Sequence, residues 1–100
     1  MSIKTDLPGI IANAQHERAA AERMAEACAR IASGESSADP QWVKATIKDL
    51  RATLADWRRL AREIEGIPAL EDVALIHRGT RRLMARSIAD LVTAARRSAP

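Results

Sequence analysis

The chain has 100 residues, the size of a single domain, and 47% of them are hydrophobic while only 2% are aromatic. The composition contains no Phe or Tyr, and much of its apolar fraction is Ala. Ala, Leu, Arg and Glu favour helices and are weak strand formers, so the composition predicts an all-α protein and argues against a sheet. We expect one helical domain over residues 1–100.

The net charge of +3 is unevenly distributed along the chain. Residues 1–76 hold 10 Lys/Arg and 12 Asp/Glu, a net of −2, whereas residues 77–100 hold six Arg and one acid, a net of +5. This asymmetry favours a C-terminal segment that meets something anionic, either nucleic acid or an acidic protein face. The alternative is a solvated basic helix face with no partner.

The first helix is expected over residues 6–33. Thr5 or Asp6 is placed to cap it, Pro8 suits its first turn, and Gly34 is a typical stop signal. Glu17 interrupts its apolar stripe at a position where an apolar residue is expected. The stripe consists of Leu7, Ile10, Ile11, Ala14, Ala21, Met24, Cys28 and Ile31.

The second helix is expected over residues 40–65, with Asp39 as the cap and Gly66 as the stop. It carries a heptad seam with alternating spacings of four and three: Val43, Ile47, Leu50, Leu54, Trp57, Ala61 and Ile64. Trp42 and Leu60 widen this stripe. The pattern therefore predicts that the second helix is the central one, packed against more than one neighbour and removed from the partner-binding surface.

The third helix is expected over residues 68–97, beginning at Pro68 and kinked or broken at Gly79, where Thr80 is placed to cap a new helix. Together the three segments predict an elongated, antiparallel three-helix bundle with coiled-coil-like packing. Helices of about 26 residues are roughly 39 Å long, so the bundle is a rod with a large surface. Because such rods commonly bury excess apolar surface by two-fold association, we expect a homodimer.

No arrangement of residues predicts catalysis, a metal site or a bound cofactor. His16 and His77 are the only histidines and Cys28 is the only cysteine, which leaves no ligand cluster and no nucleophile–base pair. The four glycines are isolated, so no phosphate-binding loop is present. We expect a non-enzymatic protein, with Cys28 buried as a small hydrophobe and His77 as a pH-sensitive core histidine.

The basic third helix is the most function-like feature of the sequence. Arg78, Arg82 and Arg86 share one face, Arg81 lies beside them, and Arg96 and Arg97 extend the charge. Guanidinium groups bind phosphate and carboxylate with forked hydrogen bonds. These six arginines are the predicted partner- or nucleic-acid-binding residues. A second basic cluster, at residues 58, 59 and 62, lies away from the heptad seam.

Two classes of function follow from this pattern. The favoured one is a protein–protein interaction module: a small helical adaptor, assembly factor or inhibitor of the kind that phage and mobile elements encode. The alternative is a nucleic-acid-binding protein that contacts phosphates through the Arg-rich helix, although aromatic residues for base stacking are lacking there. With no apolar run of membrane-spanning length and no secretory signal pattern, we expect a cytoplasmic protein without a membrane partner.

The sequence carries no family motif. Small helical-hairpin proteins with a central Trp-x-Gly turn have a comparable length, but Trp42-Val43-Lys44 and Trp57-Arg58-Arg59 both lack the glycine. The Cys/His ligand set of metal-sensing helical repressors has no counterpart beyond Cys28.

Overall fold

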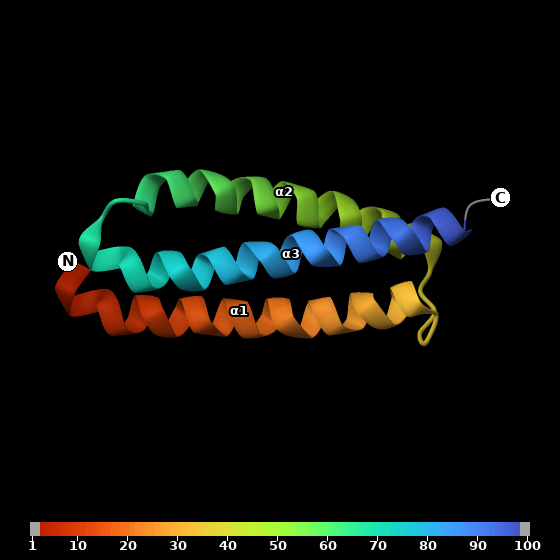
Figure 1. The fold of residues 1–100 in the computed structure, drawn as a ribbon, viewed down its shortest axis with the longest axis horizontal. Coiled ribbons are helices and arrows are strands. Elements are labelled where there is room, and N and C mark those ends of the chain that lie inside the picture. Colours follow the sequence, from red (N-terminus) through yellow and green to blue (C-terminus); the bar gives the residue numbers. More distant parts are fainter. Residues whose placement is uncertain (1–2, 99–100) are drawn as a thin grey trace.

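The structure, a computed structural model, describes the backbone of residues 3–98 and the side chains of residues 6–97. Each long helix runs antiparallel to the one before it (Figure 1), and the described residues contain no strand. The expected all-α three-helix bundle is therefore confirmed. Its elements are α1 (Ile3–Ser33), α2 (Pro40–Ile64), a short 3-10 helix η1 (Pro68–Leu70) and α3 (Glu71–Ser98).

The bundle is a rod of 54 × 21 × 18 Å. Its radius of gyration of 15.8 Å exceeds the value of about 13 Å for a compact domain of this length. Its accessible surface of 6811 Å² likewise exceeds the area of about 5,600 Å² typical of a 10.9 kDa monomer. The chain therefore exposes more surface than a compact domain of its size.

The central helix is α3, and the prediction that α2 would be central is wrong. Figure 1 shows α3 between the other two helices, and it packs along both of them, whereas α1 and α2 hardly approach each other. The inner face of α3 follows the same heptad spacing as α2 but contains polar residues, so its apolar seam is less regular than the one that made α2 look central. This face begins at Leu70 of η1 and continues along α3 with Val73, His77, Thr80, Met84, Ser87, Leu91 and Ala94.

The core consists of two apolar clusters toward opposite ends of the rod. One contains buried Ala14, Leu70 and Val73, and the other contains buried Cys28 and its neighbours Val43 and Leu91. The buried part of α3 between these clusters is polar, with His77 at 8%, Thr80 at 0% and Ser87 at 1% exposure. The middle of the bundle thus has less apolar burial than its ends.

The expected helix ends near the two loops are confirmed. Asp39 caps α2, its Oδ1 accepting a hydrogen bond from the Gln41 backbone nitrogen at 2.9 Å, and Pro40 occupies the first turn. Gly34 and Gly66 follow α1 and α2 with φ values of 87° and 89°, a conformation that favours glycine. The turns therefore fix where the long helices stop.

The predicted interruption at Gly79 is absent, because α3 runs through it as one helix. The Cδ of Arg18 in α1 lies over Gly79, 3.5 Å from the position that a Cβ would take. This is an ordinary van der Waals distance, and α3 tolerates the cost of about 1 kcal/mol that glycine carries relative to alanine. Thr80 does not cap a new helix, because its hydroxyl donates to the Ile76 carbonyl one turn earlier at 3.1 Å.

The expected start of the first helix is also wrong. The backbone is already helical at Ile3, so Thr5 and Asp6 lie within α1 instead of capping it. Pro8 lies inside the helix near its beginning, where the missing N–H costs one early hydrogen bond. Asp6 remains in the first turn, where its charge suits the helix dipole. No helix among the described residues is both long and apolar enough to cross a bilayer.

Candidate functional site

The charged residues of α2 are sorted onto different sides of the helix. Its acids occupy positions 49, 56 and 63, which are seven residues apart and therefore form a single row. Five of its cations each follow a residue of the apolar seam by one position, so they form a row beside the seam. No acid lies within this row. This α2 basic row, about 27 Å long, comprises Lys44, Lys48, Arg51, Arg58 and Arg62.

A matching row lies on the side of α3 that faces α2. Arg78, Arg82 and Arg96 share this side with Ala85, Ala89 and Val92, at alternating spacings of four and three. Because α2 and α3 are antiparallel, Arg96 lies at the Lys44 end and Arg78 at the other end of α2. We call the surface between the two rows the basic groove. Its eight cations are Lys44, Lys48, Arg51, Arg58, Arg62, Arg78, Arg82 and Arg96.

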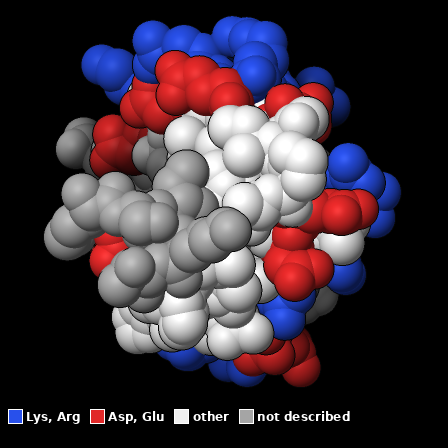
Figure 2. All heavy atoms as spheres, turned by 90° about the vertical axis from the view of Figure 1, so that its left-hand side faces the viewer, with Lys and Arg blue, Asp and Glu red and all other residues white. Residues whose placement is uncertain are grey.

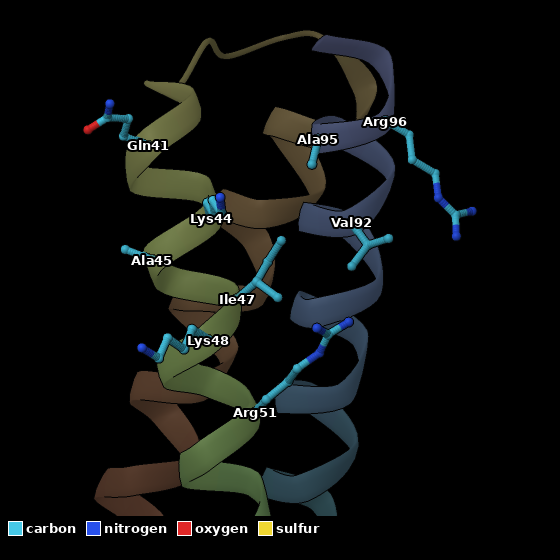
Figure 3. A pocket seen from close by; sticks show the side chains of 9 residues that line it. All are labelled: Gln41, Lys44, Ala45, Ile47, Lys48, Arg51, Val92, Ala95 and Arg96. Atoms are coloured by element: carbon cyan, nitrogen blue, oxygen red, sulfur yellow. The ribbon is translucent and has the colours of Figure 1, made fainter. Parts of the chain in front are cut away.

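The end of the basic groove near the α1–α2 loop has a volume of about 820 Å³. Ile47 points toward α3 and Val92 lies on the α3 side of the hollow, while Arg51 extends across it toward α3 (Figure 3). Lys48 and Arg96 point outward on opposite sides, and no acidic residue lines this end. The arrangement is an apolar floor with positive charge at both edges.

The opposite end of the basic groove is also apolar. A hollow of about 460 Å³ lies there, between the end of α2 and the beginning of α3, and Arg78 contributes to its lining. Its Leu75 and Ile67 are 55% and 37% exposed, which makes them two of the most exposed large hydrophobic side chains described. Glu65 and Glu71 also line this end, so it is less positive than the other.

The eight cations of the basic groove have no acidic partner within 4.0 Å among the residues that the structure describes. Ion pairs form elsewhere: Arg18–Glu22 and Arg30–Glu26 on α1, and Arg59–Asp56 on the outer side of α2. Viewed from the end of the rod, Lys and Arg gather on the side where α2 lies (Figure 2). Because like charges one turn apart repel, this surface lowers the stability of the free protein slightly.

The six arginines predicted as binding residues occupy different environments. Arg78, Arg82 and Arg96 belong to the basic groove, whereas Arg86 is exposed but does not line its hollows. Arg81 is half-buried near His77. Arg97 instead donates to the Ile31 carbonyl at 2.9 Å, satisfying the C-terminal end of α1.

The sequence reasoning missed Lys44, Lys48 and Arg51, which form the most open part of the basic groove. Their charge disappears when it is summed over residues 1–76, because the 12 acids of that stretch outnumber its 10 Lys and Arg residues. The signal that reveals them is the spacing 44, 48, 51, which parallels the apolar seam and continues to Arg58 and Arg62.

His77 lies where side chains from all three long helices meet, and its predicted core position is confirmed. Its ring lies edge to face with Trp57 of α2, with centroids 4.5 Å apart and planes at 76°. Burial lowers the pKa of His77, while Glu17 of α1 acts to raise it and Arg81 to lower it further. The His77 Nδ1 atom has no hydrogen-bond partner among the described residues.

We predict that His77 makes folding stability depend on pH below about 6.5, the ordinary pKa of its side chain. Above its ordinary pKa of 6.5 the ring is neutral in both the folded and the unfolded protein. Below that value the unfolded chain binds a proton, whereas burial in the folded core disfavours the protonated ring. Stability therefore falls as the pH drops below 6.5. His77→Leu should flatten this dependence and, by removing an unpartnered buried nitrogen, add about 1 kcal/mol at pH 7.

Urea denaturation at pH 5 and pH 7 measures this effect. The matched control is His16→Leu, at an exposed histidine of α1, which should retain the wild-type dependence. An unchanged pH dependence in His77→Leu would show that the core histidine is not responsible.

Cys28 is fully buried, as expected, and is not placed to act as a nucleophile. Burial raises the pKa of its thiol, while the neighbouring Ser87 hydroxyl acts in the opposite direction. Ser87 Oγ makes no hydrogen bond of ordinary geometry to the described residues, so the thiol is a weak polar neighbour for it. Within residues 6–97, no three His, Cys, Asp or Glu side chains come together as a metal site.

Comparisons with known proteins add no family to this description. No protein-family model matches the chain, and no curated protein or solved structure matches it.

Proposed function

We propose that the protein is a non-enzymatic protein–protein interaction module that binds an acidic surface of a larger complex through the basic groove. Its role is that of an adaptor, assembly factor or inhibitor, in the class of small cytoplasmic helical proteins that phage and mobile elements encode. The observation that carries the proposal is a pair of cationic rows without acidic partners along an apolar floor. Electrostatic complementarity of this kind gives specificity and speeds association.

The apolar floor favours a protein partner over nucleic acid. Ile47 and Val92 at one end, and Ile67 and Leu75 at the other, offer contacts that a phosphate backbone does not use. Neither end is lined by an aromatic residue on which a base could stack. A protein surface that carries both carboxylates and apolar side chains is complementary to the cationic rows and to the apolar floor of the groove.

Affinity capture from the source cells tests the proposal with two matched variants. Lys48→Glu/Arg51→Glu changes the groove, and Arg23→Glu/Arg30→Glu changes α1, and both shift the formal net charge from +3 to −1. The proposal predicts a partner that wild type and the α1 variant retain and the groove variant loses. A partner retained equally by all three proteins would contradict it.

A salt titration with random duplex DNA tests the alternative. We expect no binding, or binding that disappears by about 150 mM salt, because phosphate contacts alone give sequence-independent and salt-sensitive affinity. Binding that survives this salt and is lost in Arg78→Ala/Arg82→Ala would favour the nucleic-acid function instead.

We also propose that the protein is a homodimer, through the side of α2 away from the basic groove. Trp42 and Leu60 are 43% and 36% exposed there. A mostly apolar groove of about 290 Å³ between α1 and α2 is lined in part by Trp57, Met24 and Leu50. Light scattering after size exclusion should give twice 10.9 kDa for wild type and 10.9 kDa for Trp42→Glu/Leu60→Glu. A wild-type monomer across a wide concentration range would contradict the dimer.

A further inference from the structure

We propose that the occupant of the basic groove is an acidic amphipathic helix of about five turns, contributed by the partner protein as a fourth helix of the bundle. This inference rests on the proposed function and specifies the structure of the bound segment. An amphipathic helix in an apolar groove is a common mode of peptide recognition. Four-helix bundles are built from the same heptad packing that joins α2 to α3.

The dimensions of the groove fit a helix. The α2 basic row spans Lys44 to Arg62, about 27 Å, which equals the length of roughly 18 helical residues. The two rows lie on neighbouring antiparallel helices and both repeat with heptad spacing, which is the spacing of a helix that packs along them. A globular acidic surface would touch only part of this line.

The floor of the groove specifies the apolar side of the occupant. Between its two ends, Ala55 has the spacing of the α2 row and Ala85 and Ala89 that of the α3 row, and all three side chains are exposed. Small side chains allow helix axes to approach toward the short end of the 8–10 Å range. Larger apolar side chains lie at the two ends of the groove: Ile47 and Val92 at one end, and Ile67 and Leu75 at the other. An apolar stripe along one face of a helix reaches both ends at once.

The edges of the groove specify the charged sides of the occupant. Cations line the α2 edge at Lys48 and Arg62 and the α3 edge at Arg82 and Arg96. A helix lying between the edges presents residues to both, so it needs carboxylates flanking its apolar stripe on each side. Arg51, which extends across the floor, is placed to meet a carboxylate near one end.

A second copy of this chain is a poorer occupant. The acidic row of α2, at residues 49, 56 and 63, has heptad spacing, but α2 is already packed along its seam against α3. The whole bundle would have to dock with that helix, and its three carboxylates would face the eight cations of the groove. The occupant is therefore a segment of a different protein.

Fluorescence anisotropy with synthetic peptides tests this inference. The probe is a 20-residue peptide with Leu at heptad core positions and Glu flanking them on both sides. Its control has the same composition in a scrambled order without amphipathic spacing. We expect the ordered peptide to bind at least tenfold more tightly than the scrambled one and to gain helicity in circular dichroism on binding.

Variants locate the peptide on the protein. Lys48→Glu/Arg51→Glu and, independently, Ala89→Glu in the exposed floor should each weaken ordered-peptide binding at least tenfold, whereas Arg23→Glu/Arg30→Glu should leave it unchanged. Melting curves confirm that the variants are folded. Persistence of tight binding in both groove variants would overturn the assignment of the site.

The outcomes separate this inference from the proposed function. Equal affinity for the ordered and scrambled peptides would contradict the proposal that the occupant is a helix. It would remain consistent with the proposal that the partner is acidic. Failure of both peptides to bind wild type at 20 mM salt would overturn the anionic partner as well. Equal affinity for a 20-base-pair duplex and the ordered peptide would assign the groove to polyanions in general.

Discussion

Leu91→Ala is expected to lower the free energy of unfolding by about 3 kcal/mol, within the range of 2–5 kcal/mol for buried leucines. Leu91 is 0% exposed and packs in one cluster with Cys28 of α1 and Val43 of α2, so its side chain joins all three long helices. A cavity there cannot close by moving one helix alone. In a protein with about 5–15 kcal/mol of total stability, this loss is large.

Leu75→Ala is the matched control, because it makes the same substitution in the same helix at a side chain that is 55% exposed. Its expected cost is below about 0.5 kcal/mol. Urea denaturation followed by circular dichroism measures both variants. Equal losses at the two positions would contradict the arrangement in which α3 is central and Leu91 faces inward.

Reversing four charges of the basic groove is expected to affect binding and stability in opposite directions. In Lys48→Glu/Arg51→Glu/Arg78→Glu/Arg82→Glu, each reversal removes an attraction to an acidic ligand of about 1 kcal/mol. Together they should weaken binding of the ordered acidic peptide roughly 1000-fold. The free protein should keep or slightly raise its melting temperature, because repulsion within the rows is relieved.

Anisotropy titration and thermal melting of the same samples check both halves of this prediction. A loss of binding accompanied by a large fall in melting temperature would mean that the four residues support the fold. Retained binding in a stable variant would place the ligand on another surface.

Much of the fold was predictable because its helix ends and one apolar seam follow local rules. Asp39 with Pro40 and the two positive-φ glycines mark the loops, and the alternating spacing from Val43 to Ile64 marks the inner face of α2. The position of α3 at the centre was not predictable from apolar pattern alone. Its buried face includes His77, Thr80 and Ser87, so the stricter apolar seam of α2 was the stronger signal for a central helix.

The remaining errors have tertiary causes. Gly79 favours an interruption when the third helix is considered alone, but in the bundle the Arg18 side chain of α1 lies over it. No pattern in the local sequence predicts that contact. The α3 half of the candidate site was predicted, because a count of charges along the chain shows that the C-terminal segment is rich in Arg. Lys44 and Lys48 were hidden because the charge was summed over residues 1–76, where acids outnumber cations, although the acids of α2 itself lie on another side of that helix. Charge therefore has to be counted by helix side to find a groove between two helices.

Photo-crosslinking in the source cells tests most directly whether the basic groove is the binding surface. A photo-reactive amino acid replaces Ala85, which is exposed on α3 in the same row as Arg82 and Val92, or Ala27, which is exposed on α1. We predict a specific adduct with a partner protein from position 85 and none from position 27. An adduct from position 27 alone, or no protein adduct from position 85, would contradict binding through the basic groove.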